Sequence, residues 1–590
     1  MSKELLSGNA AFARGAWEAG VTVASAYPGT PSTEILENVS KYKDDIYCEW
    51  APNEKVALEM GVGSCLTGAR TLVAMKHVGL NVAADPFMNS SQVGTEGGLV
   101  IVVADDPGMH SSQNEQDTRN YAKFAKVPIL EPSDSQEAKD FVLRGMKISE
   151  KYETPVLIRS NTRISHSRTL VELEERIQLE REIGFEKNPE KYVAVPAFAR
   201  KMRQNVEQRS GRLKKLANRT ELNQKEIKNT ERGIITNSIS YQYVKEVFPD
   251  DSILKLGMSN PFPNQVIEEF ADEVDELLIV EELDEVIEQQ VKALGIECTG
   301  RDYVPGIGEH SPTIIENVRD QLEGASTQKE KSAPEFAQDL PGRPPNLCPG
   351  CPHRGVFYGL AQRDVIVTGD IGCYSLGAFE PLNRLDVILC MGGGISMAHG
   401  MDKSDEPKEV VGIMGDSTFF HSGITGLLDI GYNQGSSTII VVDNRTTAMT
   451  GHQDHPGTGK TLMGEQTEQR SIKEFGEACG IERISTVRPY ELEETQQVIN
   501  REIDAEDPSL IISKAPCVLK TGEAVGKVRI INHDICQDCG KCLDLGCSAI
   551  EVSPGEKPTI NPHLCSGCSM CEQVCPFGAI STKEETSNEQ

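Results

Sequence analysis

Eight cysteines between residues 529 and 581 stand in two closely spaced runs, and thiolates at such spacing bind iron–sulfur clusters. In the second run, two residues separate the first three cysteines, three residues separate the last pair, and a proline follows. This is the bacterial ferredoxin spacing, in which three thiolates bind one [4Fe–4S] cluster and the fourth binds the neighbouring cluster. In the first run, four residues separate the last pair and no proline follows. The runs are Cys536, Cys539, Cys542 and Cys547, then Cys565, Cys568, Cys571 and Cys575.

Together the runs predict a ferredoxin-like α+β module with two [4Fe–4S] clusters and crossed ligation. One cluster is expected to bind Cys536, Cys539, Cys542 and Cys575. The other is expected to bind Cys565, Cys568, Cys571 and Cys547. A zinc site or isolated structural cysteines are the alternatives, and the ferredoxin spacing of the second run argues against both. The irregular first run leaves open the type and stability of the cluster that uses Cys547.

Small and polar residues follow two apolar runs in the C-terminal half of the chain. Gly415, Asp416 and Ser417 come directly after the run EVVGIM, and Asn444 ends the run STIIVVDN. A small residue after a strand lets the backbone approach a diphosphate, and the N-terminus of the next helix supplies N–H groups. A lone Gly-Asp-Ser is weak support, because such residues often form an ordinary turn. The paired strand ends favour a diphosphate site.

The same strand ends could bind the Mg²⁺ that accompanies a diphosphate. Asp416 and Asn444 would supply side-chain oxygens, and a backbone carbonyl near Thr446 would complete the set. The pattern resembles the thiamine diphosphate motif, which is usually written GDG and, further along the chain, NN. Ser417 replaces the second glycine of that motif, and Asp443 replaces the first asparagine.

Short apolar runs rich in β-branched residues, such as VTVASAYPG and GLVIVVADD, must position these residues. They alternate with helix-like stretches, which is typical of buried parallel strands in α/β domains. The predicted segments are an α/β domain at 1–165, a charged helical connector at 166–232, a smaller α/β domain at 233–330, a linker at 331–342, a third α/β domain at 343–523 and the ferredoxin-like domain at 524–590.

Bulk properties limit the classes of function. The chain has 590 residues, more than one hydrophobic core usually supports. Its net charge of −30 argues against nonspecific nucleic-acid binding, which needs a basic surface. No apolar run reaches the roughly 20 residues of a membrane span, and the N-terminal segment lacks a signal-peptide pattern. We expect a cytoplasmic protein that binds neither nucleic acid nor membrane.

Six further segments, together with the tail, complete a family pattern. They are AYPGTPSTE at 26–34, NEKVA at 53–57, KHVGLN at 76–81, SSQNEQDTR at 111–119, CPGCPHR at 348–354 and TTAMTGHQ at 446–453. On these segments the sequence resembles the 2-oxoacid:ferredoxin oxidoreductases, most closely the branch that acts on indolepyruvate. The resemblance implies two thiamine-diphosphate-binding-type domains with doubly wound parallel sheets, which flank a smaller α/β domain like the C-terminal domain of transketolase.

The resemblance also implies roles for individual residues. Glu54 matches the glutamate that acts on the aminopyrimidine ring of thiamine diphosphate, and Glu59 is the rival position. Thr30 matches the threonine near the substrate carboxylate. His77 and Arg119 are candidates for contact with substrate or cofactor, or equally for polar groups satisfied within the protein. The resemblance gives no fixed role to three histidines in motif loops, which are His353, His452 and His455.

A third [4Fe–4S] cluster beside the thiamine cofactor is a further hypothesis from the resemblance. Related proteins ligate it with a Cys-x2-Cys pair, a cysteine in a glycine-rich turn and a distant cysteine after a strand. The residues in those places are Cys348, Cys351, Cys373 and Cys517. Buried thiols without a cluster are the alternative.

The implied activity is the oxidative decarboxylation of an aryl 2-oxoacid with coenzyme A to an aryl-acetyl-CoA and CO₂. Electrons would pass through the clusters to ferredoxin, and a smaller β subunit would complete an α2β2 heteromer. The alternatives are another substrate range, or a non-oxidative thiamine decarboxylase that yields an aldehyde. The tail favours oxidation, because a simple decarboxylase has no use for a chain of clusters. An electron-carrier scaffold would leave Glu54, Asp416 and Asn444 unexplained.

Overall fold

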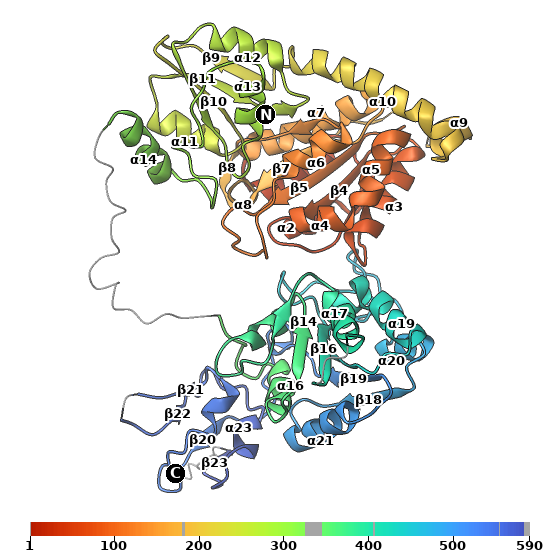
Figure 1. The fold of residues 1–590 in the computed structure, drawn as a ribbon, viewed down its shortest axis with the longest axis vertical. Helices are drawn as coiled ribbons and strands as arrows, with labels where there is room; N and C mark the ends of the chain where they lie inside the picture. The colour runs from red at the N-terminus through yellow and green to blue at the C-terminus, as the bar shows by residue number, and fades with distance from the viewer. Residues whose placement is uncertain (1, 180–182, 325–344, 405–407, 554, 583–590) are drawn as a thin grey trace. The chain divides into compact units, whose positions relative to one another are not determined.

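The computed structural model divides into two compact units, residues 1–339 and 340–590, which are described separately (Figure 1). The predicted linker 331–342 lies outside the described residues. In the part of the chain that the structure describes, no helix is long and apolar enough to span a membrane. The described residues are 2–179, 183–324, 345–404, 408–553 and 555–582.

The largest sheet of the first unit has seven strands. All neighbouring strands run parallel except the edge strand β12, which is antiparallel to β6. The central strands are buried along their whole length, as their β-branched composition predicts. In spatial order, the strands are β12 (Met258–Asn260), β6 (Ile129–Leu130), β7 (Val156–Asn161), β5 (Leu99–Asp105), β4 (Thr71–Lys76), β2 (Val23–Ala26) and β3 (Tyr47–Trp50).

Helices cover both faces of this sheet, because successive side chains of a strand point to opposite faces. On β5, Ile101 belongs to a core cluster with Leu58 and Phe87 from α3 and α5. The neighbouring Val100 lies against Gly145 of α7 instead. The helices are α1 (Gly8–Glu18), α2 (Thr33–Val39), α3 (Glu54–Leu66), α4 (His77–Val82), α5 (Ala84–Val93), α6 (Thr118–Ala125) and α7 (Ser135–Tyr152).

The first unit contains a second sheet of four strands in the order β13-β10-β11-β9. The segment 166–232 includes the long helix α10 (Pro196–Ala217), and it also supplies one strand to this sheet and one that pairs with the N-terminal strand. The strands are β1 (Lys3–Ser7) with β8 (Arg168–Glu172), and β13 (Glu276–Val280), β10 (Arg232–Asn237), β11 (Ser252–Leu256) and β9 (Asn223–Glu226).

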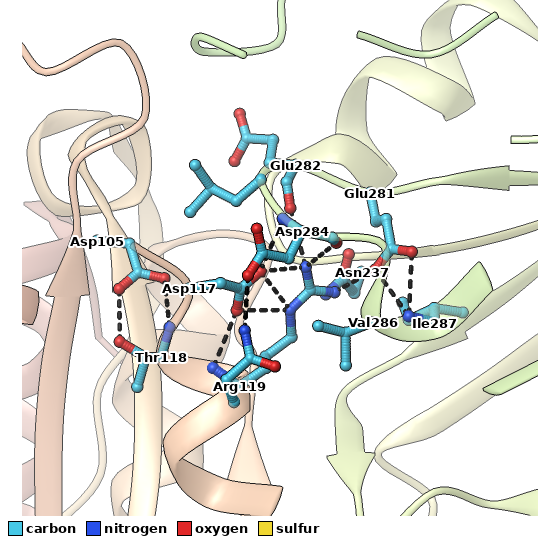
Figure 2. A network of polar contacts seen from close by, with 12 residues as sticks. Asp105, Asp117, Thr118, Arg119, Asn237, Glu281, Glu282, Asp284, Val286 and Ile287 are labelled. Carbon is cyan, nitrogen blue, oxygen red and sulfur yellow. Dashed lines mark hydrogen bonds and ion pairs between the residues drawn. The ribbon is translucent and has the colours of Figure 1, made fainter. Parts of the chain in front are cut away.

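A buried network of charges joins the two main sheets of the first unit (Figure 2). Arg119 in α6 donates to Asp117, which caps that helix, and to Glu281, which follows β13. Arg159 in β7 donates to Asp105 at the end of β5 and to a second carboxylate at the sheet interface. The second carboxylate is that of Glu131, and its Oε2 also accepts from Asn237 Nδ2 at the end of β10, at 2.7 Å.

The second unit contains a six-stranded sheet in which all neighbouring strands run parallel. The chain leaves β14 toward β15 and leaves β16 in the opposite direction, so the strand order reverses between β14 and β16. In open α/β sheets, ligands bind at the carboxyl ends of the strands beside such a point. In spatial order, the strands are β15 (Val387–Ile388), β14 (Ile366–Gly369), β16 (Val410–Gly415), β17 (Thr438–Asp443), β19 (Ser509–Lys514) and β18 (Arg483–Val487).

The cysteine-rich tail follows this sheet and contains two small antiparallel strand pairs. The outer pair is β20 (Arg529–Ile531) with β23 (Ile580–Thr582), and the inner pair is β21 (Ile550–Glu551) with β22 (Thr559–Ile560). Each cysteine run lies between strands of the two pairs. The arrangement repeats itself along the tail, as the two runs predict.

Removing the cation of the buried network should destabilise the first unit. Arg119→Met leaves Asp117 and Glu281 without their partner, and breaking a buried pair in this way costs about 3–5 kcal/mol. Both tryptophans, Trp17 and Trp50, lie in the first unit, so their fluorescence during urea unfolding follows that unit.

Glu207→Gln is the control, because it removes an exposed ion pair with Lys126. Such pairs contribute about 0–1 kcal/mol, so its unfolding midpoint should barely move. Equal midpoints for the parent and Arg119→Met would contradict the expected effect.

Candidate functional site

Three residues proposed from the sequence lie at one edge of the seven-stranded sheet. Strands β2, β3 and β4 are parallel neighbours, so their carboxyl ends meet at that edge. Thr30 follows β2, Glu54 follows β3 and His77 follows β4. The fold therefore brings together residues that lie in three separate segments of the sequence.

Glu54 begins helix α3 and is buried at 5% exposure. Asn53 caps the helix by accepting a hydrogen bond from the Val56 N–H. A Cβ at Gly79 would lie 2.5 Å from Glu54 Oε1, so the absence of a side chain there makes room for the carboxylate. Glu59, the rival position, is 46% exposed and pairs with Lys55 on the helix surface. The buried position favours Glu54 as the residue that could act on a bound group.

Lys76, the last residue of β4, also lies at this edge, although the sequence alone gave no role for it. Its Nζ donates to the Ser111 carbonyl oxygen at 2.7 Å, and its side chain lies against Gly29 of the Thr30 loop. Burial lowers the pKa of Lys76 to about 8, although the charges of Asp106 and Glu54 act to raise it. A lysine that ends a fully buried strand is unusual. Its place directly after an apolar run in the sequence is the signal that could have identified Lys76 as a candidate site residue.

His77 and Arg119 differ in how the protein engages them. His77 is buried, and its Nε2 donates to the Asn114 carbonyl oxygen at 3.1 Å, while its Nδ1 has no hydrogen-bond partner among the described residues. Arg119 uses all three guanidinium nitrogens within the network of Figure 2. Of its two proposed roles, these contacts favour a satisfied structural group.

In the second unit, the predicted diphosphate and Mg²⁺ residues lie at the carboxyl ends of β16 and β17. Asp416 begins a continuous helical segment, α18 (Asp416–Thr418), η3 (Phe419–Gly423) and α19 (Ile424–Tyr432). Asp416 Oδ2 accepts from the Arg445 N–H at 2.8 Å, which ties the two strand ends together. Asn444 Oδ1 accepts from the Thr446 N–H at 3.1 Å. Asp416, Asn444 and Thr446 are all buried.

Two histidines without a predicted role lie at this site. His455 Nε2 donates to Asp416 Oδ2 at 2.9 Å, and the Asn444 amide donates to His353 Nε2 at 3.3 Å. Burial lowers the pKa of His353 to about 4, so its imidazole is neutral and can accept that bond. Burial, together with the charge of Asp416, raises the pKa of Asp443 to about 6. His452 also lies in this loop, and its backbone carbonyl accepts from Lys520.

These residues fit a diphosphate with a divalent cation. Burial acts to raise the pKa of Asp416, but the charge and hydrogen bond of His455 lower it overall, so its oxygens are anionic. Carboxylate, amide and carbonyl oxygens are the ligands that Mg²⁺ prefers. Gly415 has no side chain to cover its backbone, which suits close approach of a diphosphate. A Cβ at Gly415 would lie 3.0 Å from the Tyr374 ring. Ser417 follows in the first helical turn, where its hydroxyl accepts from Thr447.

The four cysteines of the hypothetical third cluster come from loops at the same edge. Cys373 follows β14, Cys517 follows β19, and Cys348 and Cys351 precede α16 (His353–Leu360). Burial raises the pKa of Cys373 to about 11, and the charges of Cys517 and Cys348 contribute to the rise. Burial raises the pKa of Cys351 to about 12, with contributions from Cys373 and Cys348. The thiols are therefore near enough to one another for their charges to interact.

In the tail, the eight cysteines line two cavities, and the division follows the crossed assignment. One is the Cys565 cavity and the other is the Cys536 cavity. The first is lined by Cys547, Cys565, Cys568 and Cys571. The second is lined by Cys536, Cys539, Cys542 and Cys575.

Backbone N–H groups point at cysteine sulfurs in both cavities. The Arg529 N–H donates to Cys565 Sγ at 3.5 Å, and the Ala579 N–H donates to Cys575 Sγ at 3.3 Å. Such bonds stabilise negative charge on cluster sulfurs. In the part of the chain that the structure describes, no three His, Cys, Asp or Glu side chains converge on a site for one metal ion. The two tail cavities are each lined by four thiols, the number of ligands that a [4Fe–4S] cluster takes.

The loop that carries Cys348 and Cys351 packs against the tail. Gly350 lines the Cys565 cavity, and its carbonyl oxygen accepts from the Tyr490 hydroxyl at 2.9 Å. The Tyr490 carbonyl in turn accepts from Gln573 in the tail. Tyr490 also belongs to a small apolar cluster with Leu545 and Met570 of the tail. The third cysteine set and the Cys565 cavity are thus separated by a few residues.

Comparisons with known proteins agree with this arrangement. The family model "Pyruvate flavodoxin/ferredoxin oxidoreductase, thiamine diP-bdg" matches residues 14–232. "Thiamine pyrophosphate enzyme, C-terminal TPP binding domain" matches residues 370–513, and "4Fe-4S binding domain" matches residues 558–581. The last match covers the regular second cysteine run alone.

The curated relatives named "Indolepyruvate oxidoreductase subunit IorA" include proteins of the following three organisms. The protein of Methanothermobacter marburgensis is 41% identical, over 98% of this chain and 96% of that protein. That of Archaeoglobus fulgidus is 38% identical, over 98% and 97%. That of Pyrococcus horikoshii is 40% identical, over 99% and 97%. The similarity spans almost the full length of every chain compared.

A side chain at Gly350 should disturb the Cys565 cavity. Gly350 has a φ of 72°, and a Cβ there would lie 1.9 Å from Ser566 Oγ. Gly350→Ala therefore combines left-handed strain of about 1–2 kcal/mol with a steric clash inside the cavity lining. We expect less iron per chain after anaerobic purification, together with a lower unfolding temperature.

Gly480→Ala is the matched control, because Gly480 has a φ of 85° and nothing lies near its Cβ position. It should show the strain alone and keep the parent iron content. Equal iron in both variants would show that the Gly350 contact does not shape the cavity.

Proposed function

Because the chain belongs to the 2-oxoacid:ferredoxin oxidoreductases and is IorA-like over 98% of its length, we propose that it oxidatively decarboxylates aryl 2-oxoacids. The family and its domains establish a thiamine-diphosphate-dependent oxidoreductase that acts on an oxo group, with an iron–sulfur acceptor. The aryl substrate is supported by the name of the relatives. We propose coenzyme A as cosubstrate and aryl-acetyl-CoA, CO₂ and two reduced ferredoxins as products.

One structural observation carries the electron-transfer part of the proposal. A single unit joins the oxygen ligand set at Asp416, a thiol quartet at the same sheet edge, and a tail cavity that packs against the quartet loop. A decarboxylase that releases an aldehyde needs only the first of these. The adjacent cysteine sets support a route for single electrons from the cofactor edge into the tail.

The chain's own residues would divide the work as follows. Asp416, Asn444 and the Thr446 carbonyl would hold Mg²⁺ and, through it, the diphosphate. Thiamine diphosphate, when bound, supplies the nucleophilic carbon and the electron sink for loss of CO₂. Glu54 would protonate and polarise the aminopyrimidine from its buried position. Thr30 would donate a hydrogen bond to the substrate carboxylate.

We propose three [4Fe–4S] clusters, each held by four thiolates. Two would occupy the tail cavities, and the third would bind Cys348, Cys351, Cys373 and Cys517. Each thiol must lose its proton on binding, and iron supplies the driving force against the raised pKa of buried thiols such as Cys571, which burial raises to about 12. A smaller β subunit and ferredoxin are the proposed partners, in an α2β2 heteromer.

Iron analysis tests the cluster count. Anaerobically purified chain should contain about twelve iron atoms, and Cys373→Ser should lower this to about eight. Cys479→Ser is the control, because Cys479 is a buried cysteine of the same unit that belongs to none of the three sets. It should keep about twelve. About eight iron atoms in the parent chain would overturn the third cluster and leave the tail pair in place.

An anaerobic assay of the chain coexpressed with its β subunit tests the activity. Aryl 2-oxoacids should reduce a viologen dye in a coenzyme A-dependent reaction, faster than alkyl 2-oxoacids do. Glu54→Gln should lower this rate by at least about 100-fold, as expected for loss of an acid–base group. Thiamine diphosphate binding should persist in that variant.

Glu59→Gln is the matched control, because Glu59 is exposed and pairs with Lys55 on the surface of the same helix. It should keep the parent rate. Aldehyde formation without dye reduction would favour the non-oxidative decarboxylase instead. Full activity of the purified chain without its β subunit would refute the proposed heteromer.

A further inference from the structure

Arg354 is a fully buried cation without a carboxylate partner. It is 0% exposed. Its guanidinium donates to three backbone carbonyls, those of Leu545, Leu347 and Cys348. Its Nε has no hydrogen-bond partner, and no Asp or Glu among the described residues forms an ion pair with it. Carbonyl oxygens satisfy its donors in part, but they do not neutralise its charge.

A buried, uncompensated charge is expensive in a protein. Burying an ionised group costs several kcal/mol unless an opposite charge lies nearby. Buried Arg119 and Arg159 follow this rule, because each pairs with two carboxylates. Of the three described arginines less than 2% exposed, Arg354 is the exception. Arg209, at 4% exposure, also donates to two backbone carbonyls and forms no ion pair among the described residues, but it lines neither tail cavity. At Arg354, a negative group that protein atoms do not provide would offset the cost of the buried charge.

The position of Arg354 indicates what that negative group is. Its side chain lines the Cys565 cavity, and its charge acts to lower the pKa of Cys348 and Cys351 against the larger effect of burial. It therefore lies between two of the three thiol sets. Arg529 also lines the Cys565 cavity, but it is neutralised by Glu572 at 2.7 Å. Arg354 is left as the unpaired cation beside both sets.

We propose that Arg354 is the counter-charge of two clusters, one in the Cys565 cavity and one on the Cys348 set, and raises the reduction potential of both. The inference rests on the cluster sites proposed above. Each cluster takes up one electron and no proton, so its negative charge grows by one on reduction. A fixed cation stabilises the more negative, reduced form. Arg354 is thus a positioning residue that acts through charge and touches no substrate.

Arg354 also fastens the two sets to each other. Leu347 and Cys348 belong to the loop of the third set, whereas Leu545 lies two residues before Cys547. The Arg354 guanidinium thus binds backbone carbonyls both from the loop of the third cysteine set and from the tail. A lysine could keep the charge here but could not make the same fork of hydrogen bonds. A lysine at position 354 would therefore preserve the electrostatic role of Arg354 but lose its structural role, so the two roles can be tested separately.

Potentiometric titration of the anaerobic heteromer, followed by electron paramagnetic resonance, tests the proposal. In Arg354→Gln, the reduction equilibrium constant of two clusters should fall at least tenfold, a shift of about 59 mV for a one-electron couple. The cluster in the Cys536 cavity should titrate as in the parent, because Arg354 does not line that cavity. Arg354→Lys should restore both potentials.

Arg384→Gln is the matched control. Arg384 is a half-buried arginine of the same unit that donates to the Ala361 carbonyl and lines neither tail cavity. Its removal should shift no potential. Parent-like potentials in Arg354→Gln with full iron content would overturn the proposal.

Assembly failure would also be decisive. If Arg354→Gln loses iron while Arg354→Lys keeps iron and potentials, the charge is what the clusters need. If both variants lose iron alike, the carbonyl contacts are the essential feature and the proposal is wrong. A parent heteromer without iron at these sites would instead refute the proposed function.

Discussion

Both candidate sites of this chain depend on one constraint of parallel sheets, namely that the carboxyl ends of neighbouring strands meet at a single edge. In the first unit, this edge collects Thr30, Glu54 and Lys76 from three consecutive strand ends. In the second unit, it collects Asp416 and Asn444 beside the reversal of strand order. Without parallel pairing, these residues would alternate between opposite ends of a sheet. In the first unit, the buried charge network also ties the end of β5 and the start of α6 to the second sheet.

Residues whose positions depend on local spacing were predictable from the sequence. The cysteine runs, the strand end at Asp416 and the strand end at Asn444 each carry their information within a few residues. The division of the tail cysteines between two cavities follows the crossed assignment because a fixed spacing around a cluster leaves few geometries. The α/β class followed from the short, β-branched apolar runs, which form buried parallel strands.

Residues whose roles depend on distant contacts were not predictable. Arg119 and Glu281 meet across 162 positions, and Arg354 and Leu545 across 191. No periodicity in the sequence marks such a pairing, so Arg119 remained equally a ligand contact or a structural group. His353 and His455 were visible in motif loops, but their partners Asn444 and Asp416 lie on other strands. Charged residues in the segment 166–232 likewise concealed two short strands.

The additional residue in the first cysteine run has a structural counterpart. Gly546, just before Cys547, has a φ of 61°, and its carbonyl accepts from Asn346 Nδ2 at 2.9 Å. Leu545, one residue earlier, accepts from Arg354. The irregular spacing is thus where the tail attaches to the neighbouring α/β sheet domain, and Cys547 still lines its cavity. The sequence showed the departure from ferredoxin spacing but not its cause.

This attachment limits how the tail could be exchanged for a related module. A free-standing ferredoxin transplanted onto residue 523 would carry two clusters and a covalent tether, yet it would lack the turn that Asn346 and Arg354 hold. Electron tunnelling falls off steeply with distance, so a tethered but unanchored module would be a poor electron acceptor. The inserted residue therefore belongs to the contact between the tail and the rest of the unit, and a ferredoxin without it would not make that contact.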